Sequence, residues 1–255
     1  MTVSVITVTY NAEAVLQATL DNVLGQTWKN IEYLIIDGGS KDRTLEIVER
    51  YRAHLAVVVS EPDKGLYDAM NKGLERATGD YVCFMNAGDL FASPTALEEA
   101  MRGGQGADFI YGDAEVFTED GKPMRWHKRT PDAKHLRAER FMQGMVVCHQ
   151  AMLVRRTCAA RYNLEWKIAG DIDWSMATLQ QCRTKYYTGK PLARFLYGGL
   201  SNQRRKKALQ ERWRIGVRRF GLPATLWAHV QILWEALWRG TVSYKPLPEG
   251  GAGSA

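Results

Sequence analysis

The sequence lacks several of the patterns that would assign it to a well-marked class. No GxGxxG follows the first predicted strand and no GxxxxGK(S/T) occurs anywhere, so a dinucleotide-binding fold and a P-loop are both disfavoured. No apolar run reaches the roughly 18 residues of a membrane-spanning helix. No charged stretch followed by an apolar one precedes the first strand, so we expect a protein that is made and kept in the cytoplasm.

Cysteine is scarce, and its spacing indicates no pairing. The four cysteines, Cys83, Cys148, Cys158 and Cys182, form no CxxC pair, and two of them lie in apolar strand-like runs. Buried free thiols in a reducing compartment are therefore expected. A zinc site is disfavoured for the same reason.

Acidic residues are scarce in one segment near the C-terminus. The whole chain has a net charge of +6. Residues 204–219 alone contain eight basic residues and a single acidic one, Glu211. The bases of this basic segment are Arg204, Arg205, Lys206, Lys207, Arg212, Arg214, Arg218 and Arg219. Such an imbalance indicates an anionic partner.

The first hundred residues alternate between strand-like and helix-like segments. The expected strands are 3–9, 32–37, 55–60 and 81–86, and the expected helices are 12–25, 42–51 and 66–77. This alternation predicts an α/β fold with a mainly parallel sheet flanked by helices and joined by right-handed crossovers. Ligands of such sheets bind at the carboxyl ends of the strands.

Beyond residue 106 the regular alternation of strand-like and helix-like segments ends. The short runs DFIYGD, AEVF, MRWHK and VVCHQAMLV, all within 107–154, predict antiparallel hairpins or mixed strands. The segments that follow are a helix at 170–182, a strand at 185–197 and two helices at 202–220 and 222–239. We therefore expect a domain over 1–200 that changes its architecture at 105/106, then a helical appendage over 201–240 and a flexible tail over 241–255.

Polar side chains stand where the predicted strands end. They include an aromatic residue, Tyr10, a cation, Lys64, and two lone carboxylates, Asp37 and Asp89. This set suits a nucleotide diphosphate that is held by stacking and by a divalent metal bridging its phosphates. Asp89 is the candidate metal ligand, and the alternative is a carboxylate that makes only loop hydrogen bonds.

Four stretches in this order resemble the family 2 glycosyltransferases of the GT-A fold: TVTYNAE, IIDGGSKDRT, SEPDKGLYDAMNKGLERATGDY and FMNAGDLF. Further along, CHQAMLVRR, AGDIDW and GGLSNQ resemble a bacterial polysaccharide-biosynthesis branch of that family, of the colanic-acid type. The resemblance implies a nucleotide-sugar donor, with a UDP-sugar favoured, and Mn²⁺ or Mg²⁺. It also implies an inverting transfer of a hexose or N-acetylhexosamine to a hydroxyl group. On this resemblance the domain over 1–200 is the catalytic domain, with a nucleotide-binding half over 1–105 and an acceptor half over 106–200.

The resemblance implies roles for single residues as well. Asp89 would hold the metal, and Thr9 and Tyr10 would line the base pocket. The full set of implied donor-binding residues is Thr9, Tyr10, Asn11, Glu13, Asp37, Lys64, Asn86, Ala87, His149 and Gln150. His149 lies inside an apolar run, so a hydrogen-bonded position in the core is an equally weighted alternative to donor binding for this residue.

The chain departs from the family where the metal should bind. Asn86, Ala87, Gly88 and Asp89 stand where the family commonly has Asp-x-Asp-Asp, so one metal carboxylate remains. We expect weak affinity for the free ion, which would arrive with the donor. A non-catalytic nucleotide-sugar-binding subunit of a polysaccharide assembly complex is therefore the alternative function. A sugar nucleotidyltransferase is disfavoured because its glycine-rich loop is missing.

Inverting transfer needs a base that removes the proton of the acceptor hydroxyl. The matching family position falls at Asp171, and Asp173 would point about 200° around the helix, away from the same pocket. The alternative is that Asp171 only caps the helix, whose N-terminus would lower the pKa of the carboxyl.

The last predicted helix carries an apolar face with tryptophans beside it. The face consists of Leu226, Val230, Leu233 and Leu237, flanked by Trp227, Trp234 and Trp238. Together with the basic segment it predicts that residues 204–239 lie on an anionic membrane, at the inner face of a bacterial cell membrane, which suits a lipid-linked saccharide acceptor. Packing on the catalytic domain or on a dimer partner is the alternative. Nucleic acid is disfavoured because the aromatics follow the bases instead of alternating with them.

Overall fold

The computed structural model of the chain describes residues 1–118, 122–125, 130–197, 204–239 and 245–246. The GGLSNQ stretch at 198–203 lies outside the described residues, as do the end of the MRWHK run and most of the predicted tail.

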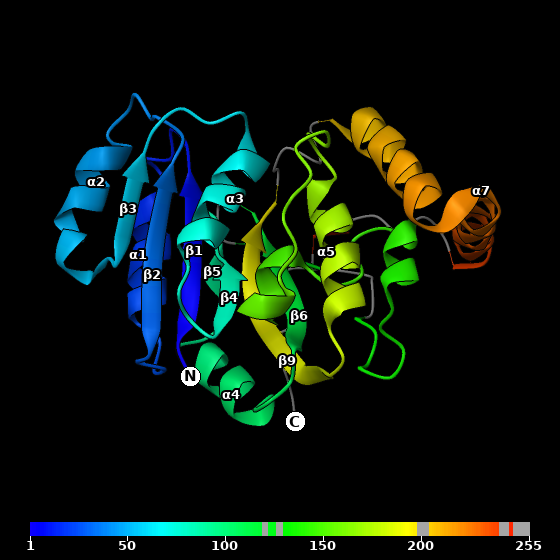
Figure 1. The fold of residues 1–255 in the computed structure, drawn as a ribbon, viewed down its shortest axis with the longest axis horizontal. Helices are drawn as coiled ribbons and strands as arrows, with labels where there is room; N and C mark the ends of the chain where they lie inside the picture. The colour runs from blue at the N-terminus through cyan, green and yellow to red at the C-terminus, as the bar shows by residue number, and fades with distance from the viewer. Residues whose placement is uncertain (119–121, 126–129, 198–203, 240–244, 247–255) are drawn as a thin grey trace.

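A mixed sheet forms the centre of the molecule, and its first part is parallel throughout (Figure 1). β1 pairs in parallel with β2 and β4, and β2 pairs in parallel with β3. These elements are β1 Val3–Thr9, α1 Leu16–Leu24, β2 Ile31–Asp37, α2 Thr44–Arg50, β3 Val57–Ser60, α3 Leu66–Arg76 and β4 Tyr81–Phe84. The predicted alternation of strands and helices is confirmed.

The first helix starts later than predicted. α1 begins at Leu16 and not at residue 12, because the backbone after β1 is tied to the next loop. The N–H of Ala12 donates to Oγ1 of Thr44 at 2.8 Å, and Asn11 stands in the left-handed region with φ 48°.

The second part of the sheet is mixed, as the end of the regular alternation predicts. β8 runs antiparallel between β4 and β6, while β9 runs parallel to β6 and antiparallel to β5. The elements are β5 Leu90–Phe91, α4 Ala96–Gly103, β6 Phe109–Phe117, β7 Pro123–Arg125, β8 Met152–Arg155 and β9 Lys185–Leu196. The prediction of a strand over 146–154 is wrong in its first half, because His149–Ala151 form a 3₁₀ turn and the strand begins at Met152.

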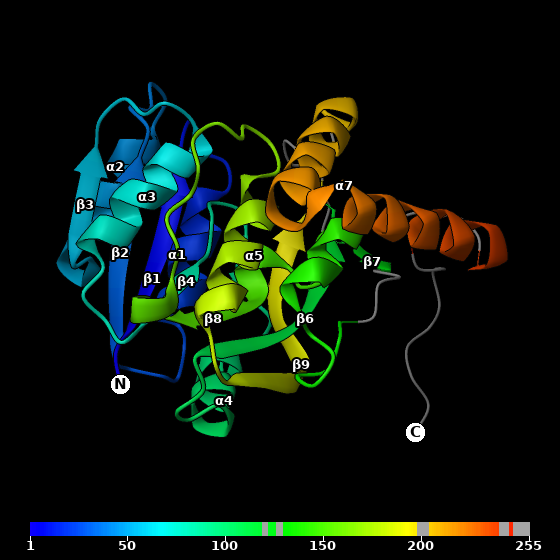
Figure 2. The same ribbon diagram turned by 45° about the vertical axis from the view of Figure 1, so that its right-hand side comes forward.

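The remaining helical elements cover the sheet and one side of the molecule. They are η1 Arg52–His54, η2 Ala138–Gln143, η3 His149–Ala151, η4 Arg156–Cys158, α5 Gly170–Gln181 and α7 Arg205–Arg239. α7 changes direction at Gly221, whose φ of 82° and ψ of 165° separate the two helices that the sequence predicts (Figure 2).

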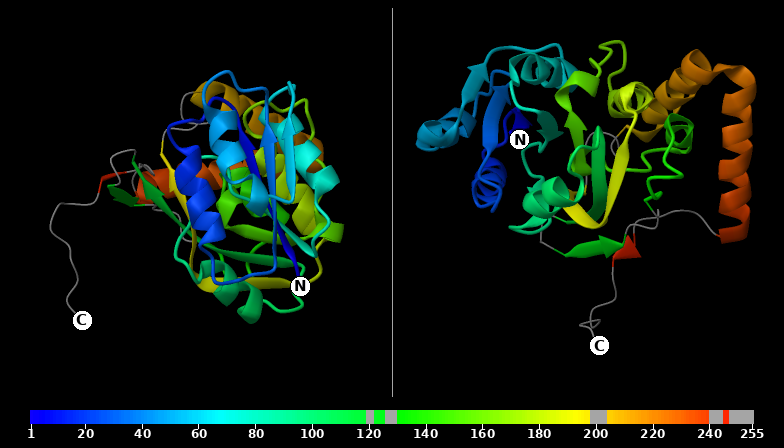
Figure 3. Two further views of the ribbon diagram at one scale, coloured as in Figure 1. Left: turned by 90° about the vertical axis from the view of Figure 1, so that its left-hand side faces the viewer. Right: turned by 60° about the horizontal axis from the view of Figure 1, so that its bottom comes forward.

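Two residues of the predicted flexible tail are ordered in a strand. β10, Lys245–Pro246, pairs antiparallel with β7 (Figure 3). No helix in the described part of the chain is long and apolar enough to cross a bilayer.

Each face of the sheet has its own core. Ile6, Val8 and Phe84 pack against α3 and α5, while Val3 and Val5 point to the other face and pack with α1, α2 and α4. Because neighbouring residues of a buried strand point to opposite faces, β1 is apolar at nearly every position. The four cysteines are free thiols, two of them buried, as expected.

Candidate functional site

The parallel strands bring their carboxyl ends together at one edge of the sheet. Thr9 at the end of β1 is in register with Asp37 at the end of β2, which is in register with Ser60 at the end of β3. The loops that follow these strands are therefore neighbours, and most of the predicted donor-binding residues lie on them.

Asp37 lies inside this edge, with 1 % of its surface exposed. One carboxylate oxygen accepts from the N–H groups of Gly39 and Ser40, both at 3.0 Å, and from Oγ of Ser60 at 2.6 Å. The other oxygen accepts from Oγ of Ser40. The carboxylate thus ties β2 to β3 and shapes the loop after β2, and its predicted contact with base or ribose stays a prediction.

Tyr10 offers the exposed aromatic surface of the site. Its side chain is 62 % exposed. The neighbouring side chains of Asn11 and Glu13 are exposed too, but both accept hydrogen bonds from the backbone of the loop after β2. Oδ1 of Asn11 accepts from the N–H of Lys41 at 2.8 Å, and Glu13 accepts from the N–H of Arg43 at 2.9 Å. Asn11 and Glu13 therefore hold the loop that presents Tyr10.

Two hydrogen-bonding atoms at this edge have no partner among the described residues. They are Oγ1 of Thr9 and Oδ1 of Asn86, and both are buried. The two residues follow the adjacent strands β1 and β4, and the N–H of Ala87 donates to the carbonyl of Val8 at 3.3 Å. Buried polar atoms in folded proteins nearly always have hydrogen-bond partners. These two atoms are therefore candidates to form hydrogen bonds with a ligand at this edge.

Asp89 ends the turn after β4. Gly88 stands at φ 97°, and Thr19 of α1 fixes the turn by accepting from the N–H of Gly88 and donating to the carbonyl of Asp89. The carboxylate of Asp89 accepts hydrogen bonds from Nε2 of Gln150 at 2.7 Å and from the N–H of Leu196 at 3.2 Å. Burial raises the pKa of Asp89 to about 7, because these two donors only partly replace water.

The surroundings of Asp89 fit a divalent metal only if ligands other than protein side chains complete its coordination shell. No group of three His, Cys, Asp or Glu residues gathers around one point in the part of the chain that the structure describes. A buried carboxylate without a cationic partner would be stabilised by a bound cation. One such ligand suffices when diphosphate oxygens and waters complete the coordination shell.

His149 and Gln150 are neighbours in sequence but point to different surroundings. Gln150 contacts Asp89, whereas Nε2 of His149 lies 2.6 Å from the hydroxyl of Tyr162. The His149 ring is 4 % exposed and lies near Phe84 and Trp174. Burial lowers its pKa to about 3, so it is neutral and occupies the core position that was the alternative to a donor contact.

Asp171 lies in the first turn of α5, after Gly170, and does not occupy the cap position, which is Ala169. Its Oδ1 accepts from the N–H of Ile172 at 2.8 Å. Burial raises its pKa to about 6, the opposite of the lowering expected from a helix N-terminus, because loss of water outweighs the helix dipole. Asp173 instead pairs with Arg219, so the two aspartates face apart as predicted.

Asp89 and Asp171 approach the same thiol. The charges of both carboxylates raise the pKa of Cys148, after the larger effect of burial. Sγ of Cys148 lies 3.1 Å from Oε1 of Gln150, whose Nε2 bonds to Asp89. The implied metal ligand and the implied base therefore both act electrostatically on Cys148. Lys64 lies exposed in the loop before α3, where its N–H donates to Asp68 at 2.9 Å.

The basic segment is only partly available to a partner. Arg214 and Arg218 pair with Glu165 while more than half of each side chain stays exposed, and Arg219 pairs with Asp173. Arg204, Arg205, Lys206 and Lys207 are exposed as well, and the contact of this segment with an anionic partner stays a prediction. The first half of α7 packs on the catalytic domain, as the alternative interpretation held.

The sequence analysis missed one buried acid in this segment. Glu211 is 5 % exposed and accepts hydrogen bonds from the backbone just before α5. A single acid among eight bases was the signal that could have identified it.

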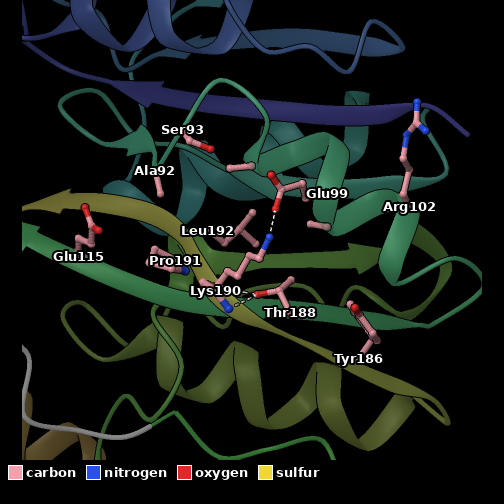
Figure 4. A pocket seen from close by; sticks show the side chains of 12 residues that line it. Ala92, Ser93, Glu99, Arg102, Glu115, Tyr186, Thr188, Lys190, Pro191 and Leu192 are labelled. Carbon is pink, nitrogen blue, oxygen red and sulfur yellow. Dashed lines mark hydrogen bonds and ion pairs between the residues drawn. The ribbon is translucent and has the colours of Figure 1, made fainter. Parts of the chain in front are cut away.

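A cavity of about 580 Å³ lies away from these strand ends, between α4 and β9 (Figure 4). Its lining includes Ser93, Tyr186 and Leu192, and an ion pair of 2.7 Å between Lys190 and Glu99 crosses it. None of the predicted site residues lines this cavity.

The model of the family "Glycosyl transferase family 2" matches residues 4–162, which contain the four strand ends and the turn at Asp89. The chain is a family 2 glycosyltransferase. It is 31 % identical over 210 residues to a "PGL/p-HBAD biosynthesis glycosyltransferase" of Mycobacterium bovis, covering 78 % of each chain.

Solved structures show which fold this glycosyltransferase adopts. S. aureus TarS 1-349 in complex with UDP-GlcNAc superposes with a TM-score of 0.69 at 17 % identity, over 93 % of this chain and 73 % of that one. The mannosyltransferase PcManGT of Pyrobaculum calidifontis, in complex with GDP-Man and Mn²⁺, gives 0.62 at 17 % identity over 94 % and 76 %. The predicted GT-A fold is confirmed.

Replacing His149 by Phe separates a donor contact from a core role. Because the ring is neutral and buried, we expect nucleotide affinity to stay within about twofold of wild type. The Tyr162 hydroxyl would lose its partner, which should lower the free energy of unfolding by about 1–3 kcal/mol. Calorimetric titration with UDP and urea unfolding measure the two effects. A folded variant whose nucleotide affinity falls more than about tenfold would identify His149 as a donor ligand.

Proposed function

We propose that this glycosyltransferase transfers a hexose or N-acetylhexosamine from a nucleotide-diphosphate sugar, with inversion, to a hydroxyl of a lipid-linked oligosaccharide or another envelope polysaccharide precursor. The observation that carries the proposal is the position of Asp171, a half-buried carboxyl that follows Gly170, which packs on Tyr67 in the first turn of α3, close to the strand ends that also carry Asp89. The UDP-GlcNAc complex of TarS supports a UDP-sugar as donor. The name of the mycobacterial relative, a "PGL/p-HBAD biosynthesis glycosyltransferase", supports a biosynthetic role.

Asp171 is suited to act as the base. A base works best when its pKa lies near the operating pH, and a value of about 6 leaves the carboxylate ionised at neutral pH. It takes the proton of the acceptor hydroxyl while the hydroxyl oxygen forms a bond to the anomeric carbon. The bond to the donor phosphate breaks on the opposite face, and the nucleoside diphosphate leaves with the electron pair.

The turn at Asp89 holds the leaving group. Mn²⁺ or Mg²⁺, as in the Mn²⁺ complex of PcManGT, would stabilise charge on the departing diphosphate. In this chain Asp89 would supply the one protein carboxylate, and Gln150 orients it through the 2.7 Å hydrogen bond. Tyr10 would stack on the base and Thr9 would contact it, while Asn86, Ala87 and Lys64 would lie along the diphosphate sugar. Asp37, Asn11 and Glu13 shape the loops of this pocket.

A non-catalytic nucleotide-sugar-binding subunit remains the second candidate. The single carboxylate at Asp89 favours it, since the metal site lacks the further acids common in the family. Release of nucleoside diphosphate by the purified protein, with bacterial membrane extract as acceptor source, would eliminate this candidate.

The second half of α7 is suited to rest on an anionic membrane at the cytoplasmic face. Its inner side contacts η2, where Nε2 of Gln143 donates to Oε1 of Gln231 at 2.9 Å. The outer side exposes an apolar surface made of Leu222, Leu226, Trp227, Val230, Leu233 and Trp234. The side chains of Leu237 and Trp238 lie outside the described part. Exposed apolar surface of this kind on a helix that follows a run of exposed bases in the sequence is typical of interfacial helices.

Replacing Asp171 by Asn should lower kcat by about 10²–10⁴-fold while nucleotide affinity stays near wild type, because only proton transfer is lost. In the wild type, kcat should rise with pH through about 6 as the base ionises. Nucleoside diphosphate release, followed from pH 5 to 8, measures both. Asp173→Asn, in the same turn of the helix, is the matched control. Wild-type turnover by Asp171→Asn would show that another group is the base.

Calorimetric titration of UDP, GDP, dTDP and CDP, with and without Mn²⁺, tests the metal site. We expect one nucleotide to bind in a metal-dependent manner, and Asp89→Ala to abolish the metal dependence because no second carboxylate replaces it. Equal affinity with and without metal in the wild type would contradict the assignment.

Triple replacement of Leu226, Trp227 and Leu233 by Ser should abolish flotation with vesicles that contain phosphatidylglycerol, because it removes the apolar surface. Leu45→Ser, at an exposed leucine on α2, is the control that keeps flotation. Unchanged flotation of the triple variant would rule out this surface as the membrane contact.

A further inference from the structure

The carboxylate of Glu211 is bound by the backbone that leads into α5. Its Oε2 accepts from the N–H groups of Lys167 at 3.0 Å, Ile168 at 2.8 Å and Ala169 at 2.9 Å. Its Oε1 lies 3.1 Å from the same Lys167 nitrogen. Successive N–H groups that converge on one anion form a nest, which compensates the cost of burying the charge.

The nest holds a stretch of chain that cannot stabilise itself locally. Ala169 precedes the helix and has no side-chain oxygen to cap it, so no side-chain cap bond forms there. The anion comes instead from α7, 42 residues further along the chain. If the carboxylate were removed, these N–H groups would lose their acceptor in a place that water reaches poorly.

α3 holds the same stretch from the other side. The hydroxyl of Tyr67 donates to the carbonyl of Ile168 at 2.8 Å, and its ring packs so closely on Gly170 that a Cβ there would lie 2.6 Å from a ring carbon. Residues 167–170 are therefore clamped between the nucleotide-binding half and α7. Asp171 is the next residue.

We propose that Glu211 is a positioning residue for sugar transfer: through the backbone of residues 167–169 it fixes the place of the Asp171 carboxylate. The inference rests on the proposed role of Asp171 as base. It makes α7 part of the catalytic apparatus, in addition to any membrane contact.

Three titratable side chains that interact with Asp171 are neutral at neutral pH. Burial raises the pKa of Tyr67 and of Tyr162 well above the ordinary value and that of Cys148 to about 12, so none of these is ionised at neutral pH. The Tyr67 hydroxyl lowers the pKa of Asp171, and the Glu211 charge raises it. Asp173, on the same helix as Asp171, is paired with Arg219.

The experiment compares wild type, Glu211→Gln, Glu211→Asp and Asp171→Asn, with Glu165→Gln as the matched control. Glu165 also docks α7, through Arg214 and Arg218, but the contacts to the three N–H groups belong to Glu211. For each variant we would measure UDP affinity, nucleoside diphosphate release with bacterial lipid extract from pH 5 to 8, and the titration of the Asp171 carboxyl by carbon-13 NMR, assigned with Asp171→Asn.

We expect Glu211→Gln to lower kcat by about 10–100-fold, because the base is misplaced, with UDP affinity within about twofold of wild type. Loss of the negative charge should move the Asp171 midpoint, and the acid limb of the kcat profile, to lower pH. Glu211→Asp keeps the negative charge, so the Asp171 midpoint in this variant should match that of wild type. Its kcat should lie between the values of wild type and Glu211→Gln. Glu165→Gln should match wild type in both respects.

Two results would overturn the inference while leaving the proposed function intact. One is a wild-type kcat in Glu211→Gln, and the other is a fall in activity that follows the folded fraction while the Asp171 midpoint does not move. Full activity of Asp171→Asn would overturn the base assignment and this inference together, so the two kinds of failure are distinguishable.

Discussion

The parallel pairing of β1 with β2 and β4 is the constraint on which the site depends. Because the three strands run the same way, their last residues and the loops after them reach one edge. Asp37 then ties the loop after β2 to β3, and Thr19 of α1 holds the turn that ends in Asp89. The helices on the two faces keep the strands in register by burying the alternate side chains of β1.

Burial decides the chemistry of the acids at this edge. Asp89 and Asp171 are both carboxyls in surroundings where donors replace only part of the lost water, and both have a raised pKa. Glu211 and Asp37 are buried as well, yet each accepts several hydrogen bonds from N–H or hydroxyl groups. Saturated carboxylates of this kind organise backbone, whereas the incompletely satisfied ones are available for a cation or a proton.

Periodicity and motif order were sufficient to predict the first four strands, their helices and the break at Gly221, because these depend on local patterns of apolar residues. The sequence could not show that His149 turns into the core, since that depends on Tyr162 and Trp174 from later segments. It could not give the direction of the Asp171 pKa shift either, because burial is a property of the assembled fold. The sequence could not show that Arg214, Arg218 and Arg219 pair with acids of the domain, because only the assembled fold brings these residues together.

The contact of Glu211 with residues 167–169 has a consequence for the order of events during synthesis. A ribosome releases the strands and helices of the nucleotide-binding half well before α7, and N-terminal units generally fold first. The nest before α5 therefore waits without its anion until the C-terminal helix emerges and docks. A nascent chain can thus complete the strand ends of its donor pocket while residues 167–169 still lack their acceptor, so under the proposed role of Glu211 the docking of α7 determines when the enzyme becomes competent.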